Sequence, residues 1–248
     1  VYQWQYNNGG TWANVLNDTP SGAVYSNAAT ATLGVSGITA AGAYDYRCSI
    51  TNCGGSNNAV SSAATLTVNT IPTITGTTPG SNCGPGTVTL VASASAGTIN
   101  WYSASSGGTS LFTGTSFTTP SLSATTTYYV DATNNGCTTA TRTEVIATVN
   151  PLPTTSAITG SLTPACSSTS NVYSVTATTG SSYAWTVPAG SIITAGAGTN
   201  SITVTFGTTS GNVTVTETNA SGCAGTPQSL AVTLQGCGLD ADFSAAPL

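Results

Sequence analysis

The sequence predicts an all-β fold made of tandem β-sandwich domains, and three observations predict it. Short runs alternate apolar residues with threonine or serine at a period of two, the pattern of half-buried strands. A tryptophan-bearing strand and a later Thr/Val-rich strand recur three times along the 248 residues. No stretch has a helical period, and turn-forming pairs separate the runs at the spacing typical of sandwiches.

The repeat begins with three tryptophans in similar settings, which we expect to be core residues: Trp4, Trp101 and Trp185. Each repeat ends with a Thr/Val-rich strand, at 65–69, 146–150 and 230–234. Proline-bearing connections follow the first two of these strands. Because proline cannot donate to a sheet ladder, it suits boundaries and edges. Domain boundaries are therefore predicted near residues 70, 150 and 236.

Individual strands follow from local alternation. Apolar residues alternate with threonine in three runs, at 88–90, 202–206 and 213–216. The pairs Asn8-Gly9 and Asn135-Gly136 are tight-turn signals and predict hairpins. The chain starts at the first tryptophan strand, so the first domain is predicted to lack its opening strands. Residues 237–248 are predicted to be the opening strand of a further domain or a donated strand.

Charge excludes several classes of partner. Charged residues make up 4% of the chain, the net charge is −5, and the only cations among the side chains are Arg47 and Arg142. Two arginines cannot neutralise a row of phosphates, so no nucleic-acid partner is expected. Every apolar run is far shorter than the ~20 residues of a membrane span. Membrane insertion is therefore not expected either.

Seven cysteines without histidine indicate disulfides and an oxidising, extracellular setting. Cysteines lie early and late in the second and third repeats, which predicts the pairs Cys83–Cys137 and Cys166–Cys223. Each pair would close a loop of about 55 residues, worth roughly 4 kcal/mol in the chain-entropy model. The pairing of the other cysteines stays open, namely Cys48, Cys53 and Cys237.

Three blocks resemble known repeats. The middle one holds W-Y-S-A-S-S-G-G-T-S-L-F-T-G-T-S-F-T-T-P, then T-T-T-Y-Y-V-D-A-T-N-N-G-C and R-T-E-V-I-A-T-V-N. It closely resembles Ig-like repeats of very large surface proteins from Bacteroidetes. The first repeat, with Y-Q-W-Q and Y-D-Y-R-C, resembles a second Ig-like variety. The third, with Y-A-W-T-V-P-A-G and N-A-S-G-C, is similar to PKD-like repeats.

The resemblance implies a partial Ig-like domain at 1–70, an Ig-like domain at 71–150 and a PKD-like domain at 151–236. It also implies export by the type IX system and a place on the bacterial cell surface. Parents of such repeats include gliding-motility adhesins. These repeats share no catalytic residue that could be transferred to this chain.

Catalytic groups are scarce in the sequence. Without histidine or lysine, the Ser-His-Asp, Cys-His and Ser-Lys nucleophile systems cannot be assembled. Asp240 and Asp242 are the one close pair of acids, and we expect them to be solvated rather than to hold calcium. We therefore expect no enzyme activity, cofactor, metal or catalytic residue.

Two functions follow from these observations. The first is a structural and adhesive repeat segment of a giant secreted surface protein that forms a stalk or filament. Its partners would be neighbouring repeats, copies of itself in a filament, or surface glycans. The second is a carbohydrate-binding accessory region of a secreted hydrolase, with Trp12 as a sugar-stacking residue. Ordinary edge packing is the competing interpretation of Trp12. On a strand, Tyr128 and Tyr129 point to opposite faces, so one of them should face solvent.

Overall fold

The computed structural model describes residues 1–52 and 58–238. This part of the chain forms strands, bridges and turns and contains no helix, which confirms the all-β prediction. It therefore has no helix that could cross a membrane. The structure divides into two compact units, one of Val1–Thr78, Val91–Phe117 and Tyr128–Val145, the other of Pro79–Leu90, Thr118–Thr127 and the described part of Ile146–Leu248.

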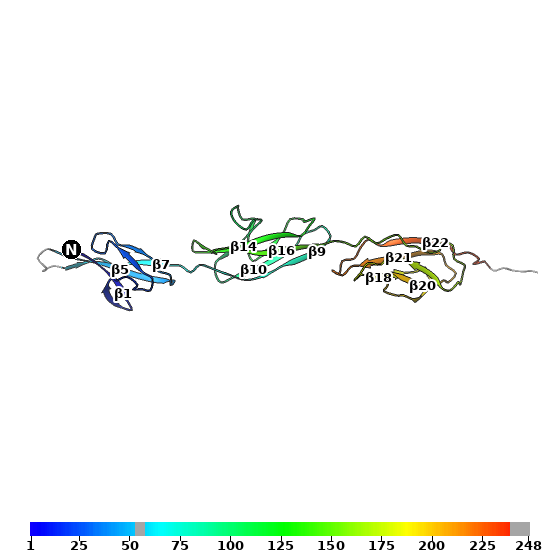
Figure 1. Cartoon of the computed structure of the whole chain (residues 1–248), viewed down its shortest axis with the longest axis horizontal. Helices are drawn as coiled ribbons and strands as arrows, with labels where there is room; N and C mark the ends of the chain where they lie inside the picture. The colour runs from blue at the N-terminus through cyan, green and yellow to red at the C-terminus, as the bar shows by residue number, and fades with distance from the viewer. Residues whose placement is uncertain (53–57, 239–248) are drawn as a thin grey trace, which may run out of the picture. The chain divides into compact units, whose positions relative to one another are not determined.

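The first segment, residues 1–70, holds a five-stranded sheet and a two-stranded sheet (Figure 1). The larger sheet has the order β2-β1-β5-β6, and β7 also pairs with β5. Its strands are β1 (Tyr2–Asn8), β2 (Thr11–Asn14), β5 (Gly42–Thr51), β6 (Asn58–Val60) and β7 (Ala64–Val68). The smaller sheet pairs β3 (Val24–Ser26) with β4 (Gly34–Ser36). A hairpin joins β1 to β2 where Asn8-Gly9 predicted a turn, but the two turn residues are Gly9 and Gly10, both at positive φ, and Asn8 is paired with Thr11.

The middle segment, residues 71–150, holds one sheet of order β13-β10-β8 and another of order β12-β11-β14-β16-β9. The first contains β8 (Ile74–Thr78), β10 (Thr89–Ala94) and β13 (Ser116–Thr118). The second contains β9 (Gly80–Cys83), β11 (Thr98–Tyr102), β12 (Phe112–Thr113), β14 (Thr126–Asn134) and β16 (Thr143–Asn150). β15 (Cys137–Thr138) folds back on β14 through Asn135-Gly136, where both residues have positive φ, as the hairpin signal predicted.

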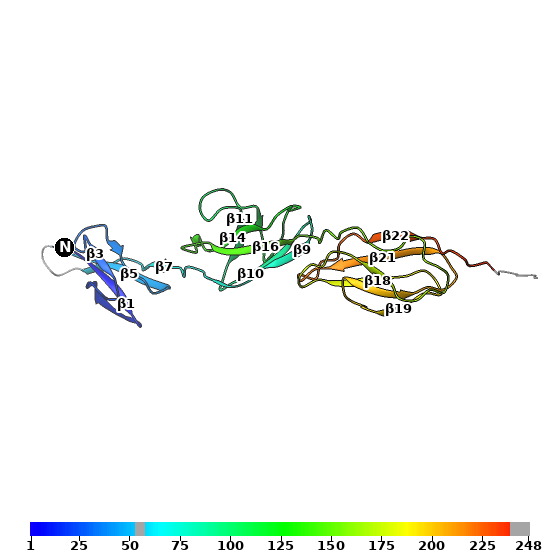
Figure 2. The same cartoon turned by 45° about the vertical axis from the view of Figure 1, so that its right-hand side comes forward.

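The last segment, residues 151–236, holds two three-stranded sheets, β17-β20-β19 and β18-β21-β22 (Figure 2). The first contains β17 (Asn171–Ser174), β19 (Ile192–Ala195) and β20 (Ser201–Thr205). The second contains β18 (Ser182–Thr186), β21 (Gly211–Thr218) and β22 (Gln228–Val232). The three predicted closing strands are thus present as β7, β16 and β22. The domain boundaries near 70, 150 and 236 stay predictions.

The period-two pattern places the core. In the last segment, Ile202 and Val204 on β20 and Val213 and Val215 on β21 are at most 1% exposed, and the threonines between them are not fully buried. In the middle segment Leu90 is likewise fully buried, whereas the neighbouring Thr89 is exposed. Apolar burial at about 25 cal/mol per Å² supplies the main driving force. Uncharged threonine provides the outer face and the β-branched shape that strands favour.

The three repeat tryptophans hold equivalent places. Trp101 is fully buried, as predicted, whereas Trp4 and Trp185 are only half-buried. Each indole N–H donates to a backbone carbonyl shortly before a strand of the smaller or facing sheet: Trp4 to Thr30 (2.9 Å), Trp101 to Gly114 (2.8 Å) and Trp185 to Thr199 (2.8 Å). The indole therefore ties a connecting loop to the sheet in every repeat.

Replacing Trp101 with phenylalanine should lower the free energy of unfolding by about 2 kcal/mol, because the Gly114 carbonyl loses its donor inside the structure. Phenylalanine keeps the stacking on Phe117, whose ring centre lies 5.5 Å away. Urea denaturation measures the change, and Trp12→Phe is the matched control because Trp12 lies outside the repeat pattern. Equal unfolding midpoints for the wild type and the Trp101 variant would contradict the role given to the indole hydrogen bond.

Candidate functional site

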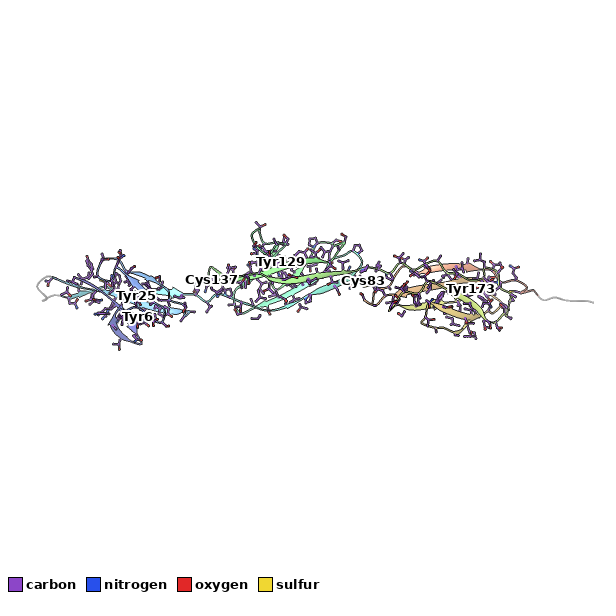
Figure 3. The ribbon with its side chains drawn as sticks, viewed as in Figure 1. Tyr6, Tyr25, Cys83, Tyr129, Cys137 and Tyr173 are labelled. Carbon is purple, nitrogen blue, oxygen red and sulfur yellow. A yellow bond between two sulfur atoms is a disulfide. The ribbon has the colours of Figure 1, made fainter. Side chains whose placement is uncertain are left out.

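A disulfide between Cys83 and Cys223 links the middle segment to the last one, and we call this region the joint. Strand β9 positions its first cysteine, Cys83. This strand pairs in parallel with the end of β16, so that Cys83 is the register partner of Asn150. The next residue, Gly84, adopts φ +70° and donates its N–H to the Asn150 carbonyl at 2.8 Å. A side chain at Gly84 would meet Leu152 at 3.3 Å. Cys83 is thereby fixed beside the connecting residues 151–155 (Figure 3).

Asn219 positions the second cysteine of the joint. Its side-chain Oδ1 accepts the N–H groups of Ser221 and Cys223, each at 3.0 Å, which closes the turn after β21. Its Nδ2 donates to the carbonyl of Pro151 at 2.8 Å. One asparagine thus shapes the turn that carries Cys223 and binds the connection between the segments. Asparagine suits this place because its side chain hydrogen-bonds nearby backbone.

Cys83 and Cys223 form a disulfide across this joint, 140 residues apart in sequence. Their Cα atoms are 5.4 Å apart, within the usual 4.4–6.8 Å range. Cys223 is fully buried. The bond, the Asn219 hydrogen bond and the packing of Leu152 on Gly84 all converge on the same short connection.

Glu217 lies beneath the joint with 1% exposure, an unusual place for a carboxylate. Its Oε2 accepts the Thr155 hydroxyl at 3.0 Å, which gives the connection a second hold. Burial acts to raise the pKa of Glu217, but the surrounding hydroxyls of Ser181, Thr178, Thr155 and Tyr183 outweigh this effect, so that the pKa is lowered. The hydrogen bond that the structure shows comes from Thr155, and Oε1 has no partner among the described residues. Neutral donors therefore keep this buried group ionised.

The predicted pair Cys83–Cys137 is wrong. Cys83 lies beside Asn150, where β16 ends, whereas Cys137 belongs to the hairpin that leads into the start of β16. A strand of eight residues spans roughly 25 Å, several times the reach of a disulfide. Cys137 forms no disulfide within the described residues.

The predicted pair Cys166–Cys223 is also wrong, for the same reason. Cys223 follows the end of β21, whereas Ser167, next to Cys166, bonds Gly207 just before β21 begins. Cys166 donates its N–H to Gln235 at 2.8 Å and forms its disulfide with Cys237, with Cα atoms 5.3 Å apart. The early and late cysteines of each repeat thus lie at opposite ends of one long strand, β16 in the middle segment and β21 in the last.

The remaining predicted site residues are placed as follows. Cys48 is buried on β5 and forms no disulfide with a described residue, while Cys53 lies outside the described residues. Trp12 is half-buried on β2, and the Arg47 guanidinium covers one ring face at 4.3 Å. That contact occupies a face that sugar stacking would need. Tyr128 is buried and Tyr129 half-exposed, in agreement with the alternation on β14.

No cluster of potential metal ligands is found in the described part of the chain. It holds no group of three or more histidine, cysteine or acidic side chains. The acids Asp240 and Asp242 lie outside the described residues, and so does most of the predicted strand at 237–248.

Two protein-family models match the chain. Residues 69–151 match the family described as "Ig-like domain CHU_C associated", and residues 151–232 match the family described as "PKD-like domain". A search of curated proteins found no match.

Several solved structures are similar. Domains 3–5 of the extracellular part of Drosophila OTK align with 94% of this chain and 85% of theirs, at 12% identity and a TM-score of 0.39. Sidekick-1 immunoglobulin domains 1–5 align with 94% of this chain and 52% of theirs, at 16% identity and a TM-score of 0.37. Fibronectin(III)-like modules of Clostridium thermocellum CbhA align with 60% of this chain and 78% of theirs, at 14% identity and a TM-score of 0.32.

The family matches meet at residue 151, inside the connection that Asn219 and the Cys83–Cys223 bond hold. The disulfide therefore joins one matched domain to the next. Residues 69–151 are thus similar to the Ig-like family described as CHU_C associated, and residues 151–232 are similar to the PKD-like family.

Proposed function

We propose that this chain is a load-bearing repeat segment of a large secreted cell-surface protein, part of a stalk or filament, and that it performs no catalysis. The observation that carries the proposal is the Cys83–Cys223 disulfide, which connects the Ig-like domain to the PKD-like domain. A disulfide between two domains gives a chain under tension a covalent path that bypasses the domain cores.

The disulfide sets the path that tension takes. A pull applied at the two chain ends passes from residue 83 to residue 223 through the sulfur atoms, so residues 84–222 carry almost none of it. The Cys166–Cys237 bond lies across the far end of the PKD-like domain and protects it further. Tandem β-domains with short connections can then extend without losing the cores of the middle and last segments.

Composition supports the same setting. Disulfides persist in oxidising compartments outside the cytosol, which favours a place at the cell surface. With 4% charged residues the surface has little like-charge repulsion, so contact with neighbouring repeats or with further copies is favoured. A bacterial giant adhesin, type IX export and gliding motility belong to this proposal through the sequence resemblance.

Single-molecule force spectroscopy tests the proposal. With handles at both ends, full reduction should add roughly 3.5 Å for each of the 140 residues spanned by the bond, on the order of 490 Å of extension. Cys48→Ser is the matched control, because Cys48 forms no disulfide with a described residue. Equal extension before and after reduction would contradict the load path. Turnover of any substrate by the oxidised chain would contradict the non-catalytic assignment.

A further inference from the structure

A pocket of about 430 Å³ lies on the outer face of the β11–β14 strand pair, and none of its lining residues belongs to the joint. Small-molecule sites typically measure roughly 300–1,000 Å³, so its size suits a compact ligand. Its polar lining comes from the loop after β11, from β14 and from the segment before β16: Ser105, Ser106, Asp131, Thr139, Thr141 and Arg142.

Strand alternation places a charge at this pocket. On β14, Tyr128, Val130 and Ala132 are buried in the core, and Asp131 points to the other face. Asp131 is nevertheless only 4% exposed. Its Oδ1 accepts Asn100 Nδ2 at 3.1 Å and the Tyr102 hydroxyl at 3.4 Å. A buried acid on an outer sheet face indicates a built polar site, because an unpaired charge there would be costly.

Arg142 is held rigidly above this acid. Its Nε pairs with Asp131 Oδ2 at 3.3 Å, and its guanidinium lies 3.2 Å from the centre of the Tyr102 ring. Its Nη1 donates to the carbonyls of Ala104 at 2.8 Å and Gly107 at 2.7 Å, which shapes the loop after β11. Nη2 has no acceptor among the described residues. These four contacts therefore fix the guanidinium of Arg142, which is one of the residues that line the pocket.

The remaining groups define what could bind. The hydroxyls of Ser105, Ser106 and Thr141 make no hydrogen bond to described residues. Tyr129, labelled in Figure 3, does not line the pocket itself, but it is half-exposed and is the register partner of Tyr102 on the same sheet face. Cross-strand partners have Cβ atoms about 4.5–5.5 Å apart. The site thus offers planar polar groups, free hydroxyls and an aromatic ring within a few residues of one another.

We propose that this pocket, named here the Arg142 pocket, binds a neutral, hydroxyl-rich sugar. The Asp131–Arg142 pair cancels its own charge, and Asp131 disfavours a second anion, so phosphate, sulfate and acidic sugars fit poorly. Vicinal hydroxyls both donate and accept, which matches a guanidinium edge beside serine and threonine hydroxyls. The ring of Tyr129 supplies a stacking surface for the apolar face of a pyranose.

This assignment does not depend on the load-bearing role, and its test is separate. The oxidised full chain labelled with ¹⁵N is titrated with four neutral disaccharides, cellobiose, lactose, maltose and mannobiose, and with an acidic hyaluronan disaccharide. We expect at least one neutral sugar to shift the amide signals of residues 103–107 and 139–142, and the acidic one to leave them unchanged. No shift with any neutral sugar, a stronger shift with the acidic sugar, or shifts elsewhere would overturn the proposal.

Two variants locate the contact. Tyr129→Ala should weaken binding at least tenfold, because the stacking surface is lost while the buried face of β14 is untouched. Tyr2→Ala is the matched control, since Tyr2 is an exposed strand tyrosine in the first segment at 38% exposure. The Tyr2 variant should bind like the wild type. Equal affinity of the Tyr129 variant and the wild type, in a protein with a native spectrum, would refute the Arg142 pocket as a sugar site.

Discussion

Replacing Cys83 and Cys223 together by serine should lower the free energy of unfolding by about 5 kcal/mol. The chain-entropy model assigns the bond this value because it closes a loop of 140 residues in the unfolded chain. The same model gives the Cys166–Cys237 bond, with a separation of 71 residues, about 4 kcal/mol. Guanidinium denaturation of the oxidised proteins measures the difference.

Cys137→Ser provides the control for this experiment. It removes a cysteine that forms no described disulfide. The free energy of unfolding should stay within about 0.5 kcal/mol of the wild-type value, as it does for surface substitutions. If the Cys137 variant lost as much stability as the double variant, the pairing of Cys83 with Cys223 would be refuted. Peptide mapping under non-reducing conditions identifies the linked residues directly.

Glu217→Gln should lower the stability of the PKD-like domain by about 2–3 kcal/mol at neutral pH. The amide keeps the shape but loses the charge that the surrounding hydroxyls stabilise, and hydrogen bonds to charged groups are worth roughly 1.5–3 kcal/mol. Thr155 also loses its charged acceptor, so the connection to the Ig-like domain should loosen. Thermal unfolding followed by circular dichroism measures the effect, with exposed Glu144→Gln as the matched control.

The pH dependence of this effect has a definite sign. The pKa of Glu217 is lowered in the folded protein from its ordinary value of 4.5, so the folded state favours the ionised form. Its contribution to stability is fully present above pH 4.5 and is lost as pH falls through the lower folded value. The difference between wild type and Glu217→Gln should therefore shrink as the pH falls from 4.5 through the lowered pKa of Glu217. A difference that stayed constant down to pH 2 would contradict an ionised Glu217.

Local pattern was enough to predict the strands. Alternation of Ile202, Val204 and Phe206 with threonine identified β20 and its buried face, because a period of two has one geometric meaning in an extended chain. The Asn135-Gly136 hairpin followed from the positive φ values that such turns require. These features depend on neighbours in sequence.

Disulfide connectivity depended on distance through the fold, which the sequence does not contain. Cys83 and Cys137 belong to one repeat but are separated by the length of β16, whereas Cys83 and Cys223 meet although 140 residues lie between them.

In the Arg142 pocket, too, the residue types could be read from the sequence but their association could not. The sequence contained only two arginines, and each has a definite partner: Arg47 lies over Trp12, and Arg142 pairs with Asp131. Trp12 was the predicted sugar-stacking residue, yet one of its faces is covered. Asp131 and Tyr102 come from adjacent strands, so their association with Arg142 required the register of β11 on β14.

The disulfide between residues 83 and 223 also affects what happens when a peptidase cuts the chain. Arg142 is the one tryptic target between these two cysteines, and a cut there would divide the backbone into residues 1–142 and 143–248. The halves would still travel as one molecule, because each holds one of the two sulfur atoms. Cleavage of any peptide bond between residues 84 and 222 has the same result. A peptidase that cuts there would therefore not release the C-terminal fragment.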